Sequence, residues 1–285
     1  MSSEAANKWS SRRQRNKSAS GCTLRNQSTQ SDGTIESRLL QHRKEDLHSE
    51  IDLKPGKMKS LTCILLLVIG VPNFADDRLS AEGPVLPKVL IIGDSISLGY
   101  TPLVSQLFDG IAEVVHHPGN AQHTGTGLEM MDEWIGDTKW EVIQFNWGLW
   151  DLCYRHPESQ HYGNRDKING TITTDLEQYG LNLEILVTRL IKTNAQLVWA
   201  NTTIVPEGEA GRFVGDDERY NEIAAQVMRK HEIQIIDLHD LTSQFPSDMF
   251  VAPGDVHFTK DGYALIAEEV AKQISSALAE ASLSR

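Results

Sequence analysis

The sequence predicts an α/β protein with three layers, in which a five-stranded parallel sheet lies between two layers of helices. From residue 85 onward, short apolar runs alternate with amphipathic stretches, an order typical of strands and helices that follow one another. The apolar runs lack a strict apolar–polar alternation, which indicates strands that are buried on both faces. No pattern recurs at a fixed period, so the sequence does not predict a repeat architecture.

The predicted elements alternate along the chain. The expected strands are residues 89–92, 112–118, 140–148, 195–203 and 233–238. The expected helices are residues 102–111, 126–136, 173–194, 217–231 and 260–281. The third helix has the clearest pattern, because its leucines recur at helical spacing. Thr174 and Glu177 are predicted to form a capping box at its start.

Composition divides the chain into three parts. Residues 1–57 are rich in Ser, Asn, Gln and Arg, and are predicted to be a disordered or non-native extension, with the natural start at Met58. Residues 58–75 have flanking lysines and an apolar core of signal-peptide length, and are predicted to be a secretory signal. The alternative is a short membrane anchor behind a cytosolic tail. Residues 76–285 are the predicted functional domain, which places it in a secreted or periplasmic location without stable membrane insertion after cleavage.

Charge and cysteine content restrict the partners of this domain. Residues 76–285 hold 32 Asp and Glu against 15 Lys and Arg, which argues against binding to nucleic acid or to an anionic membrane. Of Cys22, Cys63 and Cys153, only Cys153 remains after the predicted cleavage. A single cysteine forms neither an intramolecular disulfide nor a cysteine-based zinc site.

Polar residues with catalytic potential follow the predicted strands. Ser95 comes directly after the first strand, and Asp255 and His257 lie just before the last helix. Parallel sheets bind ligands at the carboxyl ends of their strands, so we expect these side chains to converge there. Ser95 would be the nucleophile, His257 the base that takes its proton, and Asp255 the group that orients the imidazole. The alternatives are a helix-capping serine and a solvated loop histidine.

Acyl transfer from an ester also needs donors for the oxyanion and groups that hold the substrate. Backbone N–H groups near Ser95 and in the 119–127 loop are candidates for the donors, together with the side-chain amide of Asn146. Of Trp147 and Trp150, one is expected to pack in the core. Trp150 is the candidate that stacks on a sugar ring. Arg155 would contact an acidic sugar, or else lie in solvent as a surface residue.

No cofactor or metal is expected. Five histidines cluster in sequence near two of the strand ends, but without a spacing typical of metal ligands. They are His116, His117, His123, His156 and His161. The long loop from Val205 to Arg219 is interpreted as either a lid over the site or a mobile insertion.

Two segments carry a resemblance to a known family. "IIGDSISLG" at the start of the domain and "DVHFTKDGYALIAEEVA" at its end resemble the first and last blocks of the SGNH hydrolases, also called GDSL-type esterases and lipases. The resemblance covers about residues 86–280 and implies a flavodoxin-like fold. It also implies that Ser95 is the nucleophile, His257 the base and Asp255 the third member of a triad.

The chain departs from the family pattern at three places. The family aspartate stands three residues before the histidine, where this chain has Gly254, and Asp255 stands two before it. Trp150 takes the place of the third-block asparagine, so Asn146 is expected to supply the amide. Gln122 takes the place of the second-block glycine, and its backbone N–H is expected to serve the oxyanion.

Together these observations predict a secreted serine esterase that removes short acyl groups, such as acetyl, from a carbohydrate. Export, the acidic surface and the aromatic loop favour a carbohydrate ester over other small-molecule esters. Two alternatives stay open. One is a catalytically impaired carbohydrate-binding protein on the same scaffold, and the other is a lipase or thioesterase, which would need a long apolar groove.

Overall fold

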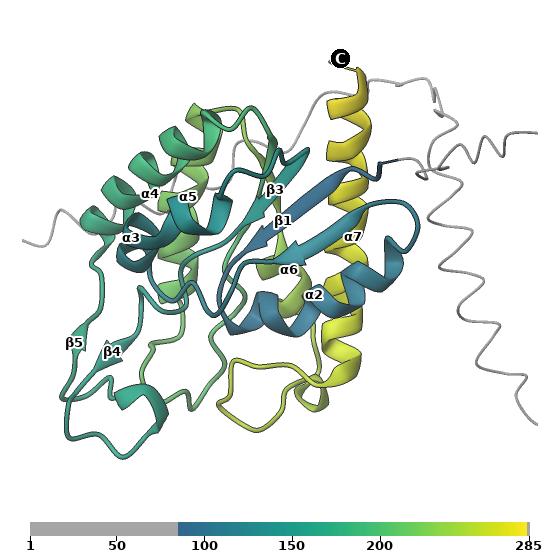
Figure 1. Cartoon of the computed structure of the whole chain (residues 1–285). Helices are drawn as coiled ribbons and strands as arrows, with labels where there is room; N and C mark the ends of the chain where they lie inside the picture. Colours follow the sequence, from purple (N-terminus) through teal and green to yellow (C-terminus); the bar gives the residue numbers. More distant parts are fainter. Residues whose placement is uncertain (1–84, 284–285) are drawn as a thin grey trace, which may run out of the picture.

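The computed structural model describes residues 85–283 and contains the predicted five-stranded parallel sheet (Figure 1). Its strands are β1 (Lys88–Ile92), β2 (Glu113–His116), β3 (Val142–Phe145), β6 (Gln196–Ala200) and β7 (Gln234–Ile236). Their spatial order is β2-β1-β3-β6-β7, and all neighbouring pairs are parallel. The predicted fold class is therefore confirmed. The predicted extension (1–57) and signal (58–75) lie outside the described residues.

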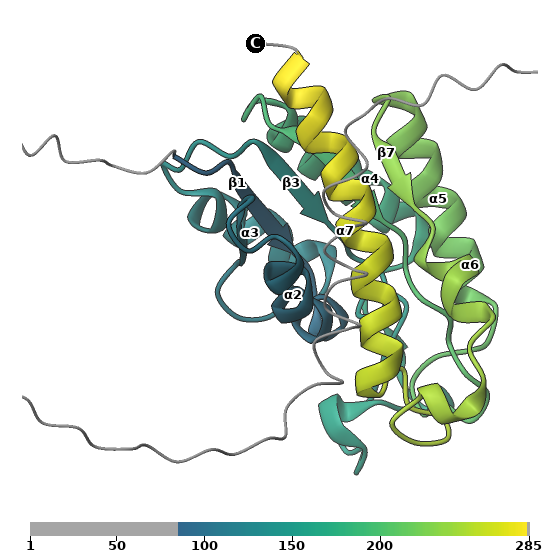
Figure 2. The same ribbon diagram turned by 90° about the vertical axis from the view of Figure 1, so that its right-hand side faces the viewer.

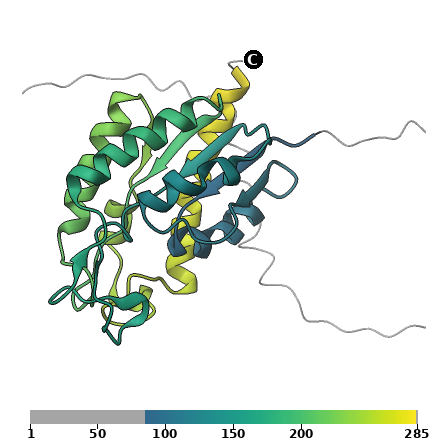
Figure 3. The same ribbon diagram turned by 60° about the vertical axis from the view of Figure 1, so that its left-hand side comes forward.

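Helices cover both faces of this sheet. One layer is formed by α3 (Thr124–Ile135), α4 (Leu176–Ile191) and α5 (Asp216–Lys230) (Figure 3). The opposite layer is formed by α2 (Ser95–Leu107), α6 (Leu238–Ser243) and α7 (Lys260–Leu283) (Figure 2). The strands are buried between the two layers, as their continuous apolar runs require. Across residues 85–283, no helix has the length and apolar character needed to cross a membrane.

The strand order places a crevice at the carboxyl ends of β1 and β3. The chain leaves β1 toward β2 at one edge and then returns to β3 on the other side of β1. Such a reversal sends the connections that follow the two neighbouring strands in opposite directions. The space that opens between them is the ligand-binding crevice of open α/β sheets. Ile92 lies opposite Phe145, and Asn146 N–H donates to the Ile92 carbonyl at 2.9 Å. The segments that begin at Gly93 and Asn146 therefore leave the sheet side by side.

Segments outside the main sheet gather at this carboxyl edge. The strands β4 (Tyr154–Arg155) and β5 (Thr171–Ile172) form a small hairpin, and η2 (Tyr162–Asn164) lies between them. This hairpin lies on the side to which β1 and β3 point (Figure 1). A second short turn, η3 (Ser247–Met249), precedes α7. None of these elements was predicted, because two-residue strands leave no periodic pattern in the sequence.

Two buried residues anchor the long loop after β6 to the rest of the domain. Glu209 and Arg212 within it are 1% and 4% exposed. Arg212 Nε donates to the Leu149 carbonyl at 2.6 Å, which ties the loop to the segment after β3. The interpretations as a lid and as a mobile insertion, which rested on the length and the glycines of this loop, stay predictions.

Two predicted helix starts are also corrected. The first helix begins at Ser95 instead of residue 102, because the Asp94 carboxylate accepts from Ile96 N–H at 2.9 Å and caps α2. The helix α4 is capped by Asp175, whose side chain accepts from Gln178 N–H at 2.8 Å. Thr174 does not form the predicted capping box because its side chain hydrogen-bonds to Asp151.

Close packing of α2 against α7 gives a test of the fold. A Cβ added at Gly99 would lie 2.2 Å from Cζ of the Tyr263 ring, so Gly99→Ala overpacks the contact. We expect the free energy of unfolding to fall by about 1–3 kcal/mol in chemical denaturation. In a Tyr263→Leu background the same substitution should cost much less, because the ring is gone and alanine favours helix. Equal costs in the two backgrounds would contradict this packing.

Candidate active site

Ser95 and His257 meet at the carboxyl edge of the sheet. Ser95 is the first residue of α2, and its Oγ lies 2.8 Å from His257 Nε2. His257 Nδ1 lies 2.6 Å from Asp255 Oδ1 on the other side of the ring. A carboxylate oxygen accepts only, so Nδ1 carries the ring proton and Nε2 is left with a lone pair toward Ser95. The three side chains are therefore arranged so that a proton can pass from Ser95 to His257.

A tight turn makes the short spacing between Asp255 and His257 effective. Gly254 has a φ of +74°, and a Cβ there would lie 2.7 Å from the Gly208 carbonyl oxygen. Only glycine fits this position. The turn lets one carboxylate oxygen of Asp255 contact both the backbone N–H and the ring Nδ1 of His257. Asp255 Oδ1 accepts from His257 N–H at 2.9 Å as well as facing Nδ1. The aspartate two residues upstream thus reaches the imidazole.

The charge of Asp255 is stabilised by the same contacts. Partial burial opposes ionisation, but hydrogen bonds from the His257 backbone and ring outweigh it and hold the pKa of Asp255 below its usual value. The positive charge of Arg165 acts in the same direction. The carboxylate is therefore ionised at neutral pH and can stabilise a positive charge on the imidazole.

The residues on either side of His257 are buried in the core, and this fixes the direction of the His257 side chain. Val256 and Phe258, on either side of His257, are buried. The Phe258 ring packs against Phe245, Phe250 and Tyr263, with centroids 5.1–5.7 Å apart. With its neighbours fixed in the core, His257 is directed outward over the start of α2. The segment is also held by Val251 N–H, which donates to the His257 carbonyl at 3.0 Å.

Asp94 is buried directly beside the nucleophile. Its Oδ1 accepts from Ile96 N–H, and its Oδ2 has no hydrogen-bond partner among the described residues. Burial raises the pKa of Asp94, although the hydrogen bond from Ile96 N–H and the positive charge of Arg212 partly oppose the rise. Asp94 therefore caps the start of α2 and shapes the turn that precedes Ser95.

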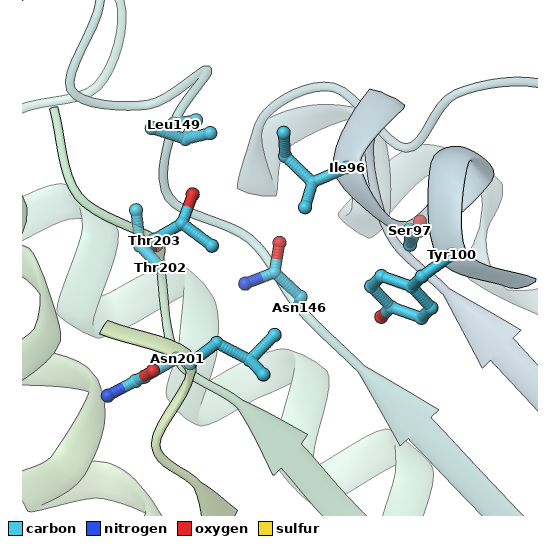
Figure 4. Close-up of a pocket in the computed structure, with 9 residues that line it drawn as sticks. Ile96, Ser97, Tyr100, Asn146, Leu149, Asn201, Thr202 and Thr203 are labelled. Carbon is cyan, nitrogen blue, oxygen red and sulfur yellow. The ribbon is translucent and has the colours of Figure 1, made fainter. Parts of the chain in front are cut away.

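Two of the three predicted oxyanion donors are engaged within the protein. Gln122 has a φ of +51°, the conformation in which glycine is favoured, and its N–H donates to Asn120 Oδ1 at 2.8 Å. Asn146 Nδ2 donates to the Ala200 carbonyl at 2.8 Å. This bond turns the amide nitrogen toward the end of β6 and leaves the oxygen on the side of Ile96 (Figure 4). The amide nitrogen carries a second N–H besides the one that this bond uses, so the role of Asn146 as an oxyanion donor stays a prediction.

The aspartate after Trp150 clamps two loops of the site together. Asp151 is fully buried and accepts from Thr124 N–H at 3.0 Å and from Thr124 Oγ1 at 2.6 Å. Asn182 Nδ2 donates to the same hydroxyl at 2.9 Å. Burial raises the pKa of Asp151 to about 7. Asp151 thus fixes the start of α3, and with it the loop that contains Gln122.

The two predicted substrate-binding residues contact one another. The guanidinium carbon of Arg155 lies 4.3 Å from the centre of the Trp150 ring. Arg155 Nε donates to Thr173 Oγ1 at 3.2 Å, and its Nη1 donates to the Gly163 carbonyl. Trp147 is fully buried, so it is the tryptophan that packs in the core. Trp150 is only partly buried and has its orientation fixed by Arg155.

A buried ion network beside the site was missed by the sequence analysis. Glu209 Oε1 lies 2.7 Å from Arg165 Nη1 and 2.9 Å from Arg212 Nη1. The only signal in the sequence was an acidic and a basic residue three positions apart, which is too common to be informative. The network joins the hairpin that contains Arg165 to the loop after β6. It also brings the positive charge of Arg165 close enough to affect Asp255.

The clustered histidines have other partners. His116 and His117 stack with ring centroids 4.4 Å apart, and both rings face backbone carbonyl oxygens. Within residues 85–283, no three His, Cys, Asp or Glu side chains are grouped so that they could hold a metal ion.

A comparison with known protein families agrees with this arrangement of the site. Residues 91–265, more than half of the chain, match the model of the GDSL-like lipase/acylhydrolase family. The chain belongs to this family. Its members are ester hydrolases of the SGNH superfamily, as the first and last sequence blocks predicted. A comparison with curated proteins found no match.

Solved structures of GDSL hydrolases share the fold at low sequence identity. An acetyl xylan esterase superposes with a TM-score of 0.54 at 17% identity, covering 66% of this chain and 99% of that one. A lipase/acylhydrolase from Enterococcus faecalis gives 0.55 at 18% identity, covering 67% and 96%. A catalytic mutant of an acetylxylan esterase from Geobacillus stearothermophilus gives 0.53 at 15%, covering 66% and 94%.

The raised pKa of Asp151 predicts a pH-dependent stability. The folded state keeps the Asp151 proton up to about pH 7, whereas the unfolded state releases it near pH 4. The folded state binds more protons in this window, so stability should fall as the pH rises from 4 to 7, by up to ~4 kcal/mol. Urea unfolding of wild type and Asp151→Asn across this range measures the effect. Identical pH dependence in the two proteins would contradict the prediction.

Proposed function

We propose that this GDSL hydrolase is a secreted serine esterase that removes short acyl groups, such as acetyl, from a carbohydrate. The observation that carries the proposal is the 2.8 Å contact between Ser95 Oγ and His257 Nε2, with Asp255 on the far side of the ring. The reaction needs neither a metal nor an organic cofactor. Export rests on the predicted signal at residues 58–75.

The proposed reaction has two halves. His257 takes the proton of Ser95 as Oγ attacks the ester carbonyl, and the ionised Asp255 stabilises the imidazolium that forms. The imidazolium then protonates the alcohol oxygen, the carbon–oxygen bond of the ester breaks, and the acyl group stays on Ser95. In the second half, His257 takes a proton from water as the water oxygen attacks the acyl carbon. The imidazolium then gives this proton to Ser95 Oγ as the bond from Oγ to the acyl carbon breaks, which releases the acid and restores the free enzyme.

Backbone donors are proposed to stabilise the oxyanion. Ser95 N–H lies at the start of α2, where helix N–H groups and the helix dipole favour a negative charge. Gln122 N–H joins it by exchanging the Asn120 amide oxygen for the oxyanion, since a charged acceptor forms the stronger hydrogen bond. The clamp between Asp151 and Thr124 holds the Gln122 loop in place for this exchange.

Trp150 and Arg155 stack on one another, and this pair is here called the sugar platform. It supports a carbohydrate as the alcohol part of the ester. An aromatic ring with a fixed orientation binds the apolar face of a sugar, and the guanidinium beneath it limits the ring's motion. Two of the similar solved structures are acetyl xylan esterases, which supports an acetylated sugar as the first substrate to test.

The engaged donors favour a second candidate, a carbohydrate-binding protein that has lost turnover. If Gln122 keeps its bond to Asn120, Ser95 N–H is left without a second backbone donor from this loop. Losing one oxyanion donor typically slows such enzymes by ~10²–10³-fold. Hydrolysis of p-nitrophenyl acetate by the purified protein separates the two candidates.

A matched pair of serines tests the nucleophile. Ser97 Oγ also faces a histidine, His116 Nε2 at 2.7 Å, but it is 2% exposed and donates to the Asp94 carbonyl. We expect Ser95→Ala to reduce kcat for p-nitrophenyl acetate by at least ~10³-fold, because no hydroxyl remains to form the acyl-enzyme. Ser97→Ala should lose no more than about tenfold. Wild-type turnover by Ser95→Ala would end the proposal.

The sugar platform makes a separate prediction. Trp150→Ala should raise KM for an acetylated xylo-oligosaccharide by about tenfold and change kcat little, because a stacking contact is made equally in the ground and transition states. The KM for p-nitrophenyl acetate, which has no sugar, serves as the control and should stay within about twofold. An equal rise for both substrates would show that Trp150 supports the site without contacting the sugar.

A further inference from the structure

Two arginines stand directly opposite one another at the carboxyl edge of the sheet. Arg155 ends β4 and Arg165 follows η2, and the two residues form an antiparallel bridge. The backbone hydrogen bonds next to this bridge join the residues on either side of the pair. Arg155 and Arg165 therefore have the close side-chain spacing of a non-hydrogen-bonded pair. Like charges at opposite positions destabilise the pairing, which makes a negative group beside them favourable.

The structure supplies only one carboxylate for this positive charge. Glu209 Oε1 lies 2.7 Å from Arg165 Nη1, but it also lies 2.9 Å from Arg212 Nη1 and is shared between the two guanidiniums. Arg155 donates to a hydroxyl and to a backbone carbonyl, and neither carries a charge. Within residues 85–283, three neighbouring arginines thus have a single carboxylate in contact with them.

The surroundings of Arg155 disfavour its own charge. Burial is the largest cause that lowers the pKa of this guanidinium, and the positive charges of Arg212 and Arg165 lower it further. Glu209 opposes the shift without cancelling it. A second negative group at this place would offset both the burial and the repulsion.

Each guanidinium of the opposed pair keeps one amino group for a ligand. The hydrogen bonds of Arg155 use Nε and Nη1, and those of Arg165 also use Nε and Nη1. No described residue accepts a hydrogen bond from Nη2 of either arginine. Both side chains are only partly buried, so a ligand can reach them. The planar donors of a guanidinium match the geometry of a carboxylate.

The pair connects the catalytic groups to the sugar platform. The charge of Arg165 acts on Asp255, the carboxylate that contacts His257. On the other strand, the guanidinium carbon of Arg155 lies 4.3 Å from the centre of the Trp150 ring. A sugar that extends from the Trp150 ring toward His257 therefore passes close to the two guanidiniums.

We infer that Arg155 and Arg165 bind a carboxylate of the sugar, so that the substrate is an acylated uronic acid. This inference rests on the proposed function, because it assigns a chemical class to the alcohol part of the ester that Ser95 attacks. It extends the contact predicted for Arg155, since it adds Arg165 as the second residue. The domain as a whole is acidic, and the opposed arginines are the local exception that an anionic substrate requires.

Sugars that differ by one charge test the inference. The acids are methyl glucuronoside and methyl galacturonoside, acetylated on their ring hydroxyls, and each neutral counterpart carries an amide in place of the carboxylate. The measurement is the kcat/KM for acetate release from the acid divided by that for its amide on the same sample. We expect a wild-type ratio of at least ~10 for one of the two sugars, because a charged acceptor forms the stronger hydrogen bonds.

Arg165→Gln removes one guanidinium and should lower this ratio at least about fivefold. The ratio does not depend on the folded fraction or on the effect of Arg165 on Asp255, because the acid and the amide meet the same catalytic groups. Arg155→Gln is the second variant, in case Arg165→Gln does not fold, and it should lower the ratio in the same way. Arg229→Gln is the matched control. It removes the same charge from the exposed last turn of α5, where Arg229 pairs with Glu222, and should leave the ratio within about twofold.

The inference and the proposed function fail by different results. A wild-type ratio near 1 for both sugars, or an unchanged ratio in a folded Arg165→Gln or Arg155→Gln protein, overturns the inference. Turnover that survives Ser95→Ala overturns the proposed function. If the wild type releases no acetate from any of these sugars, the proposed function also fails, and the dissociation constants of the acid and the amide are compared instead. Tighter binding of the acid that is lost in Arg165→Gln then supports the inference, and equal binding overturns it.

Discussion

The contact between Ser95 Oγ and His257 Nε2 is the constraint on which the rest of this structure depends. It joins residues 162 positions apart, one at the start of the first described helix and one just before the last. Both must lie at the carboxyl edge of the same sheet, which the parallel arrangement of β1, β3, β6 and β7 provides. The helices α2 and α7 pack against each other, so the two segments that contain the pair are fixed by the same interface.

The loops around this contact are held by buried polar groups instead of by additional apolar packing. Asp151 fixes the start of α3, Glu209 joins Arg165 to Arg212, and Arg212 binds the carbonyl of Leu149. Each buried charge carries a desolvation cost, which hydrogen bonds and opposite charges offset. In return, each bond has a defined direction, so the loops have one arrangement at the site. Sequence patterns report apolar periodicity and do not detect this kind of support.

The limits of the sequence analysis follow from the same distinction. The strands and the convergence of Ser95, Asp255 and His257 were predictable, because a parallel sheet brings its carboxyl ends to one edge whatever the loops contain. The direction of the Asn146 amide was not predictable, since its acceptor is a backbone carbonyl on a neighbouring strand, Ala200. Thr174 was assigned to a helix cap because its true partner, Asp151, is distant from it in sequence.

The pKa values of three aspartates near the site are shifted in different directions because their surroundings differ. Hydrogen bonds from His257 hold the pKa of Asp255 low, whereas burial raises the pKa of Asp94 and Asp151. Environments that separate the pKa values of neighbouring carboxyl groups also separate their roles. Asp255, the carboxylate in contact with the imidazole ring, is the one whose pKa is held low, so it is ionised at neutral pH and can stabilise a proton that arrives on Nε2.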